Sequence, residues 1–238
     1  MTESQSEPRP EFQPESGPDV QPEPDAPATP LVLLHGVGQA PMAWEDLVVR
    51  FYGSRRLLTP WVPGLRPTET RPVPVEEAAD RLAQEIELEG LGRVDLCAQS
   101  WGSMVATRLA ADHPDRVRRL VLIGGQVRTP KLVSGVQAGL LRMMPASRLA
   151  DAGVSKDRLT AMLDVARRTD LTDALPRITA ATLVLVGERD RAGQLGARSL
   201  ADGIAGARLR VVQGAGPSLN EERPEELEHL LRDFLDRD

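Results

Sequence analysis

The sequence predicts one α/β domain built on a mostly parallel sheet. From residue 30 onward, short apolar runs alternate with stretches of helical periodicity, which is the pattern of strands joined by helices. The chain has 238 residues, of which 41% are hydrophobic, and this suits one domain with a single large core. The apolar runs place the expected strands at residues 31–34, 56–60, 93–98, 117–123, 182–186 and 209–212.

Three helices are predicted from spacing and end signals. Over residues 75–89, apolar side chains recur at helical spacing behind an acidic first turn. Another helix follows Ser100 and ends near His113, since a proline comes next. A third runs from Pro224 to about Leu235, because a proline in the first turn lacks only an N–H that would be unpaired anyway.

The first 30 residues form a segment of different composition. They hold eight prolines, seven acids and one arginine, with almost no apolar periodicity, so we expect a disordered tail. The tail carries the −6 net charge of the whole chain, which leaves residues 31–238 close to neutral. A neutral body argues against nucleic-acid binding, which requires a basic face.

Residues 126–178 interrupt the strand pattern with about fifty residues. They contain Leu140, Leu141, Met143 and Met144, and then a helix-like stretch over residues 159–168. An insertion of this length commonly covers an active site, so we expect a helical cap. The alternative is a helical pair packed on the edge of the sheet. The core is then residues 31–125 and 179–238.

A strand, a tight turn and a helix meet at Ser100 in the run Ala98-Gln99-Ser100-Trp101-Gly102. This run resembles the small-x-Ser-x-small nucleophile elbow of the α/β-hydrolase superfamily. The resemblance extends over residues 31–238 and implies the α/β-hydrolase fold, serine-dependent hydrolysis of small acyl esters or amides, and no metal or organic cofactor. An ordinary helix N-cap is the alternative role for Ser100.

Two further stretches match the family in type and order. His35-Gly36-Val37-Gly38 follows the first strand and resembles the oxyanion loop, which implies that the backbone N–H groups of Val37 and Trp101 are the oxyanion donors. By the same match, His35 is a structural residue of that loop. The stretch 187–190 resembles the acid loop and implies that Asp190 is the acid, the alternative being a solvated loop residue.

The stretch Gly214-Ala215-Gly216-Pro217 stands where the family has its histidine loop. Proline has no titratable group, so the general base is missing at residue 217. The chain has only two histidines besides His35. His113 lies 13 residues along a helix from Ser100, roughly 20 Å away, and His229 lies in the final helix. We expect none of the three to replace the base.

Two functions of different class remain open. The chain is a serine hydrolase whose base has been lost, or it is a non-catalytic protein that binds a small apolar or acyl-containing ligand. Codons for His and Pro differ by one base, so a recent or artificial change at residue 217 is a third possibility. The tryptophans near strand ends either line the pocket or belong to the core, and they are Trp44, Trp61 and Trp101.

The remaining features bear on location. Cys97 is the single cysteine, which excludes an internal disulfide and fits a reducing compartment, and we expect it to be a small core residue. The opening residues lack the basic and apolar regions of a secretory signal, and no apolar run approaches the ~20 residues needed to cross a bilayer. We therefore expect a cytoplasmic protein that binds neither membrane nor nucleic acid.

Overall fold

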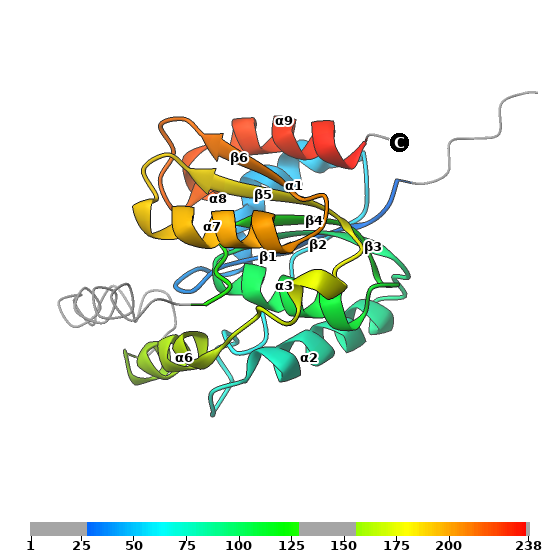
Figure 1. Cartoon of the computed structure of the whole chain (residues 1–238). Helices are drawn as coiled ribbons and strands as arrows, with labels where there is room; N and C mark the ends of the chain where they lie inside the picture. The colour runs from blue at the N-terminus through cyan, green and yellow to red at the C-terminus, as the bar shows by residue number, and fades with distance from the viewer. Residues whose placement is uncertain (1–27, 129–155, 237–238) are drawn as a thin grey trace, which may run out of the picture.

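A computed structural model describes residues 28–128 and 156–236. Residues 1–27 of the expected tail and residues 129–155 of the expected cap, including Leu140 through Met144, lie outside the described residues. The described part contains one six-stranded parallel sheet in the order β2-β1-β3-β4-β5-β6, flanked by helices on both faces (Figure 1). The predicted α/β class is confirmed.

The strands follow the predicted order with small changes at their ends. They are β1 Leu31–Leu34, β2 Leu57–Leu58, β3 Val94–Gln99, β4 Val117–Ile123, β5 Ala181–Gly187 and β6 Arg208–Val212. β2 is shorter than the predicted 56–60, since only two residue pairs, beginning at Leu31 and Leu57, lie in register with β1. β1, β3 and the last four residues of β4 are fully buried, because helices cover both faces of the sheet.

The helices divide between the two faces of the sheet (Figure 1). One apolar core contains side chains of α2 Val75–Leu88, α3 Trp101–Asp112, α6 Lys156–Arg168 and α7 Arg191–Gly203. The other core lies under α1 Glu45–Phe51, the short helix α8 Leu219–Glu222 and α9 Pro224–Leu235. Two 3₁₀ helices, η1 Pro41–Trp44 and η2 Leu175–Arg177, complete the described elements.

The three predicted helices occur within one residue of their expected ends. α2 stops at Leu88, and Gly90 follows with a left-handed φ of 68°. α3 ends at Asp112, with His113 as its C-cap residue. Three further described helices, α1, α7 and the short α8, have no counterpart in the prediction. α7 contains three glycines, and the low helix propensity of glycine made this stretch resemble a loop.

The insertion in which we expect a cap is described only in part. α6 begins three residues before the predicted helix-like stretch and ends with it at Arg168. Its Met162 is buried in the same core as α2 and α3. An isolated antiparallel bridge joins Arg128, near the start of the insertion, to Asp170, two residues after α6. The side chains of the same two residues form an ion pair of 2.7 Å.

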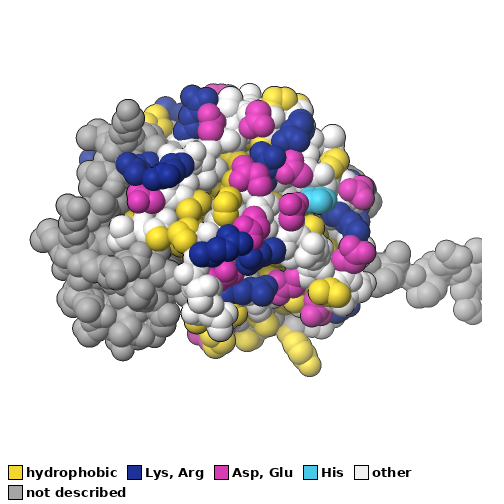
Figure 2. All heavy atoms as spheres, turned by 90° about the horizontal axis from the view of Figure 1, so that it is seen from below, with side chains coloured by type: hydrophobic (Ala, Val, Ile, Leu, Met, Phe, Trp, Pro, Cys, Tyr) yellow, Lys and Arg dark blue, Asp and Glu magenta, His cyan; other side chains and the backbone are white. Residues whose placement is uncertain are grey.

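Acidic and basic side chains alternate over the face that carries α2 (Figure 2). Arg81, for example, pairs with both Glu69 and Glu77. Such mixed charge differs from the single-sign basic surface that nucleic-acid binding requires. Among the described residues, no helix combines the length and apolar character needed to cross a bilayer.

Candidate active site

Ser100 stands at the corner between β3 and α3. Its φ of 51° and ψ of −115° make it the one non-glycine residue with positive φ in the described part of the chain. Its N–H donates to the carbonyl of Ile123 at the end of β4, at 2.9 Å. Its side chain accepts no capping hydrogen bond from α3. The hydroxyl is therefore presented by a strained backbone and does not serve as a helix cap.

Two glycines allow the chain to close tightly around this corner. A Cβ placed on Gly36 would lie 2.9 Å from the Cβ of Ser100. A Cβ on Gly102 would lie 2.6 Å from the Leu34 carbonyl oxygen. Both distances are shorter than real Cβ contacts allow, so glycine is required at each position. The loop after β1 consequently lies directly against Ser100.

The two expected donors are positioned by these contacts. Within the described residues, neither the Val37 N–H nor the Trp101 N–H has a hydrogen-bond acceptor. The Trp101 indole is buried, and its Nε1–H donates to the Pro63 carbonyl at 3.2 Å. Val37 packs against the core beside α3. Both amides are thus free to donate to a ligand atom.

Asp190 follows β5 and is the N-cap residue of α7. Its carboxylate accepts the Gly193 N–H at 2.8 Å. A Cβ on Gly193 would lie 2.0 Å from the other carboxylate oxygen, so a larger residue at 193 would displace the carboxylate from this position. Burial raises the pKa of Asp190, the Gly193 hydrogen bond opposes the rise, and the charge of Glu222 adds to it. Asp190 is therefore a half-buried, fixed acid and not a solvated loop residue.

Gly124, just after β4, marks the point where the acid and the loop of residue 217 meet. A Cβ there would lie 3.5 Å from an Asp190 carboxylate oxygen and 3.9 Å from the Pro217 carbonyl oxygen. It would also lie 4.0 Å from Nε2 of Gln99, the neighbour of Ser100. The end of β3 and the residues that follow β4, β5 and β6 therefore converge here, as expected at the carboxyl edge of such a sheet.

All three histidines of the chain lie in the described region, and their surroundings can be compared with the expectation that none serves Ser100 as a base. His35 is fully buried; its Nε2 accepts the Val62 N–H at 3.2 Å. Its proton therefore sits on Nδ1 and points to the Gly36 carbonyl, 3.1 Å away. Burial lowers the pKa of His35 to about 4, and the bond to Gly36 partly offsets this. Both ring nitrogens are occupied by the backbone.

The other two histidines lie away from the corner. His113 caps α3 at its far end, and its Nε2 is 3.1 Å from a carboxylate oxygen of Asp80 in α2. His229 is exposed on α9. The imidazoles of this chain thus provide no proton acceptor for Ser100.

The remaining sequence candidates are core residues or packing partners. Cys97 is fully buried in β3, and burial raises the pKa of its thiol far above the usual range. Trp44 is buried in the core beneath α9. Of its two expected roles, pocket lining or core packing, it therefore has the second. Trp61 lies edge-on to His35, with ring centroids 5.2 Å apart.

A family model described as the alpha/beta hydrolase family matches residues 31–230. The chain is an α/β hydrolase. It is 39% identical over 94 residues to a pimeloyl-acyl-carrier-protein methyl ester esterase of Aromatoleum aromaticum, a match covering 40% of this chain and 36% of that one. It is 35% identical over 120 residues to a 2-hydroxymuconate semialdehyde hydrolase of Pseudomonas sp. strain CF600, covering 46% and 41% of the two chains.

The same fold occurs in solved structures. The enol-lactonase of Burkholderia xenovorans LB400 superposes with a TM-score of 0.78 over 89% of this α/β hydrolase and 93% of that chain, at 23% identity. This likeness concerns the fold. The alignments with the two sequence relatives span less than half of their lengths.

Sequence reasoning missed two side chains of this α/β hydrolase that contact the loop of residue 217. Gln99 donates from Nε2 to the Pro217 carbonyl, and the Glu222 carboxylate accepts backbone N–H groups on either side of Pro217. For Gln99 the available signal was its place next to Ser100. No such signal exists in the sequence for Glu222, because the fold of the loop, and no local periodicity, places its carboxylate against the backbone around residue 217.

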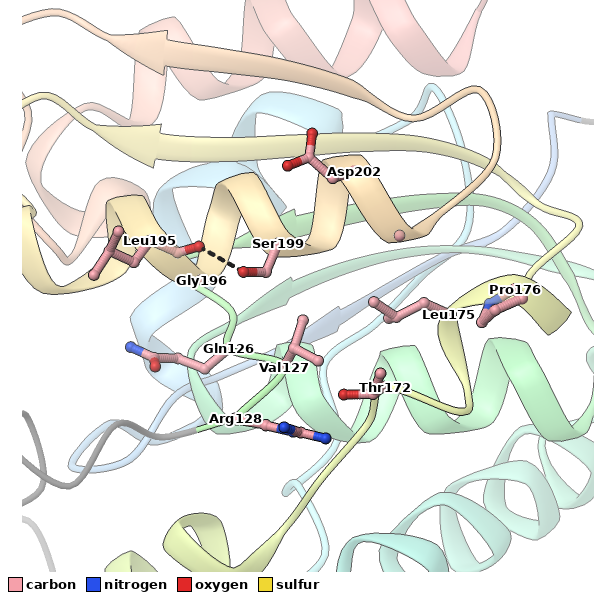
Figure 3. Close-up of a pocket in the computed structure, with 11 residues that line it drawn as sticks. Gln126, Val127, Arg128, Thr172, Leu175, Pro176, Leu195, Gly196, Ser199 and Asp202 are labelled. Atoms are coloured by element: carbon pink, nitrogen blue, oxygen red, sulfur yellow. Dashed lines mark hydrogen bonds between the residues drawn. The ribbon is translucent and has the colours of Figure 1, made fainter.

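A separate cavity of about 680 Å³ lies beside α7 (Figure 3). Ser100, Asp190 and Pro217 do not line it. Two of its polar side chains donate to backbone carbonyl groups of α7, Gln126 to that of Ala192 and Ser199 to that of Leu195. Its walls come from the residues after β4, η2 and α7, namely Gln126, Val127, Arg128, Thr172, Leu175, Pro176, Leu195, Gly196, Ser199, Asp202 and Gly203.

Proposed function

We propose that this α/β hydrolase is of the serine type, acts on small acyl esters or amides, and is impaired because residue 217 is proline. The observation that carries the proposal is the strained corner at Ser100, next to two unoccupied backbone donors. Strained backbone conformations of this kind cluster at functional sites. The names of the two sequence relatives, an esterase and a hydrolase, support the same class of reaction.

In the proposed reaction, the Ser100 hydroxyl oxygen attacks an acyl carbon. The N–H groups of Val37 and Trp101 then stabilise the negative charge that develops on the carbonyl oxygen. In such sites an imidazole takes the hydroxyl proton and later delivers it to the leaving group, while the acid orients that imidazole. In this chain Asp190 would be the acid that orients the imidazole, but Pro217 provides no imidazole.

The size of the impairment follows from the missing step. Loss of the base of such a triad lowers kcat by about 10⁴ to 10⁶, equivalent to roughly 5 to 8 kcal/mol of barrier. The oxyanion donors and substrate binding alone still accelerate the reaction roughly 10³-fold over the uncatalysed rate. An unperturbed carboxylate, with a pKa near 4, is a poor base at neutral pH. We therefore expect slow turnover of activated esters only.

The backbone around residue 217 supports restoration by a single substitution. Gly216 and Ser218 donate their N–H groups to Glu222, and the Pro217 carbonyl accepts from Gln99. None of these contacts uses the side chain of residue 217, which is exposed. A histidine there would keep every one of them.

A fluorophosphonate probe, which labels activated serines, tests the proposal. We expect Pro217→His to raise the labelling rate at least 100-fold over the native chain. Ser100→Ala in the same background should abolish labelling. Pro217→Ala is the matched control, since it removes the proline ring without adding an imidazole, and it should label as slowly as the native chain.

Two outcomes would contradict the proposal. If Pro217→His labels no faster than Pro217→Ala, the rest of the site cannot support hydrolysis, and a non-catalytic protein that binds a small apolar or acyl-containing ligand becomes the better explanation. If the native chain already labels as fast as Pro217→His, some other group acts as the base. We also propose a cytoplasmic location, because a single cysteine fits a reducing compartment, and no nucleic-acid or membrane partner, because residues 31–238 are close to neutral.

A further inference from the structure

The loop around residue 217 is held from below by one carboxylate. The two oxygens of Glu222 accept the N–H of Gly216 at 2.6 Å and the N–H of Ser218 at 3.1 Å. Glu222 ends α8, so the chain leaves residue 217, makes one helical turn and returns a charged acceptor to it. Hydrogen bonds to a charged group are stronger than neutral ones, so this contact restrains the loop firmly.

The tightness of this contact appears at Gly216. A Cβ on Gly216 would lie 2.6 and 2.7 Å from the two carboxylate oxygens of Glu222. The carboxylate therefore lies directly against the backbone, and a larger residue at 216 would displace it. The acid loop adds a second restraint, because Arg189 donates its N–H to the Ala215 carbonyl at 2.9 Å.

The loop is held from the opposite side by Gln99. Its Nε2 donates to the Pro217 carbonyl, although the two residues are 118 positions apart. Its Oε1 is buried and has no hydrogen-bond partner among the described residues. A half-satisfied buried amide is unfavourable, and an apolar side chain of the same shape would avoid that cost. Stability alone therefore does not explain a carboxamide here.

We propose that Gln99 and Glu222 are positioning residues that fix residue 217 relative to Ser100 and Asp190. Gln99 precedes Ser100 directly, so it ties the serine corner to the loop of residue 217. Glu222 holds the peptide groups on both sides of that residue. This inference rests on the proposed function, because a position for residue 217 matters to chemistry only if an imidazole works there.

The kinetic test uses the Pro217→His background and 4-nitrophenyl acetate as substrate. Gln99→Met and Glu222→Gln each remove a contact to the loop with little change of shape. We expect each to lower kcat at least tenfold and to change KM less than twofold, because a misplaced base impairs the chemical step and leaves substrate contacts intact. Glu226→Gln, on neighbouring α9, is the matched control. The Glu226 side chain has no hydrogen-bond or ion-pair partner among the described residues, so this variant should change neither kcat nor KM.

A second measurement needs no active enzyme. In the native chain, Glu222→Gln should speed hydrogen exchange at the Gly216 and Ser218 amides at least tenfold, and Glu226→Gln should leave both unchanged. If Pro217→His is inactive but exchange responds as stated, the proposed function fails while the loop restraint stands. If Pro217→His is active and the Gln99 and Glu222 variants match it in kcat, the positioning role is wrong.

Discussion

At the scale of single residues, Ser100 and His35 show how backbone contacts prepare the site. Ser100 occupies a backbone conformation that costs on the order of 1–3 kcal/mol, and it is held there by Ile123 and by the glycines around it. His35 is buried beside it, with both nitrogens bonded to backbone groups. The imidazole nearest to the corner therefore supports the loop after β1 and is unavailable as a base.

The neutral state of His35 makes stability depend on pH. The unfolded chain protonates this residue near pH 6.5, whereas the folded chain does so only near pH 4. Between these values the unfolded state binds more protons, so stability falls as the pH falls. The contribution of neutral His35 to the free energy of unfolding is fully present above pH 6.5. About 3 kcal/mol of it is lost by pH 4.

His35→Gln should remove this dependence, because an amide oxygen can still accept the Val62 N–H. Urea unfolding at several pH values measures the difference. From pH 7 to pH 4 the native chain should lose about 3 kcal/mol more than the variant does. Equal losses in the two proteins would mean that folding does not lower the pKa of His35.

At the scale of elements, the parallel sheet explains why the candidate residues meet. β1, β3, β5 and β6 each end at the same edge, and the loops after them carry the residues discussed above. Where two elements approach closely, the space between them limits the size of the side chain at the contact. α3 starts so near to β1 that Gly102 faces two backbone carbonyl oxygens, those of Leu34 and His35.

Gly102→Ala discriminates between helix propensity and this close approach. Alanine is the better helix former by about 1 kcal/mol, yet its Cβ would lie 2.6 Å from one carbonyl oxygen and 2.8 Å from the other. We expect a net loss of about 2 kcal/mol in the free energy of unfolding. Gly92→Ala is the control, since nothing lies within 4 Å of its added Cβ, and it should cost nothing. A gain in stability for Gly102→Ala would show that α3 can shift away from β1.

At the scale of the whole molecule, a buried ionic cluster joins the middle of the sheet to the end of the chain. Asp95 in β3 is fully buried and accepts two hydrogen bonds from Arg118 in β4, at 2.9 and 2.6 Å. Arg55, whose side chain is 3% exposed, also contacts Asp95 and pairs with Asp236. Arg118 in turn donates to the Leu235 carbonyl. The cluster thereby anchors α9 to the sheet.

Asp95→Asn should destabilise the whole fold, because it removes the buried negative charge that Arg55 and Arg118 share and leaves Arg55 paired with the half-exposed Asp236. Breaking a buried pair in this way costs about 3–5 kcal/mol. The matched change is Glu87→Gln in the exposed pair with Arg116, which should cost less than about 1 kcal/mol. Denaturant unfolding of both variants provides the comparison, and similar losses would contradict a special role for Asp95.

Much of this molecule could be predicted from local pattern. The apolar runs located all six strands of the described sheet, and end signals placed α2, α3 and α9 within a residue or so. α7 was missed because its glycines oppose helix formation locally. Packing explains two of them, since Gly196 would meet the Gly125 carbonyl oxygen at 2.4 Å if it carried a Cβ, and a Cβ on Gly193 would displace the Asp190 carboxylate. Local propensity is overridden where elements pack this closely.

By itself, the sequence determined the order of strands and helices, the serine at a strand-to-helix turn, and the lack of a histidine at residue 217. These features depend on neighbours within one or two turns of chain. Only the tertiary structure decided that backbone groups occupy His35, that Asp190 caps α7, and that Gln99 and Glu222 hold the loop of residue 217. Most of these contacts join segments that meet because a parallel sheet ends its strands at one edge, and no local periodicity encodes which loops will touch there.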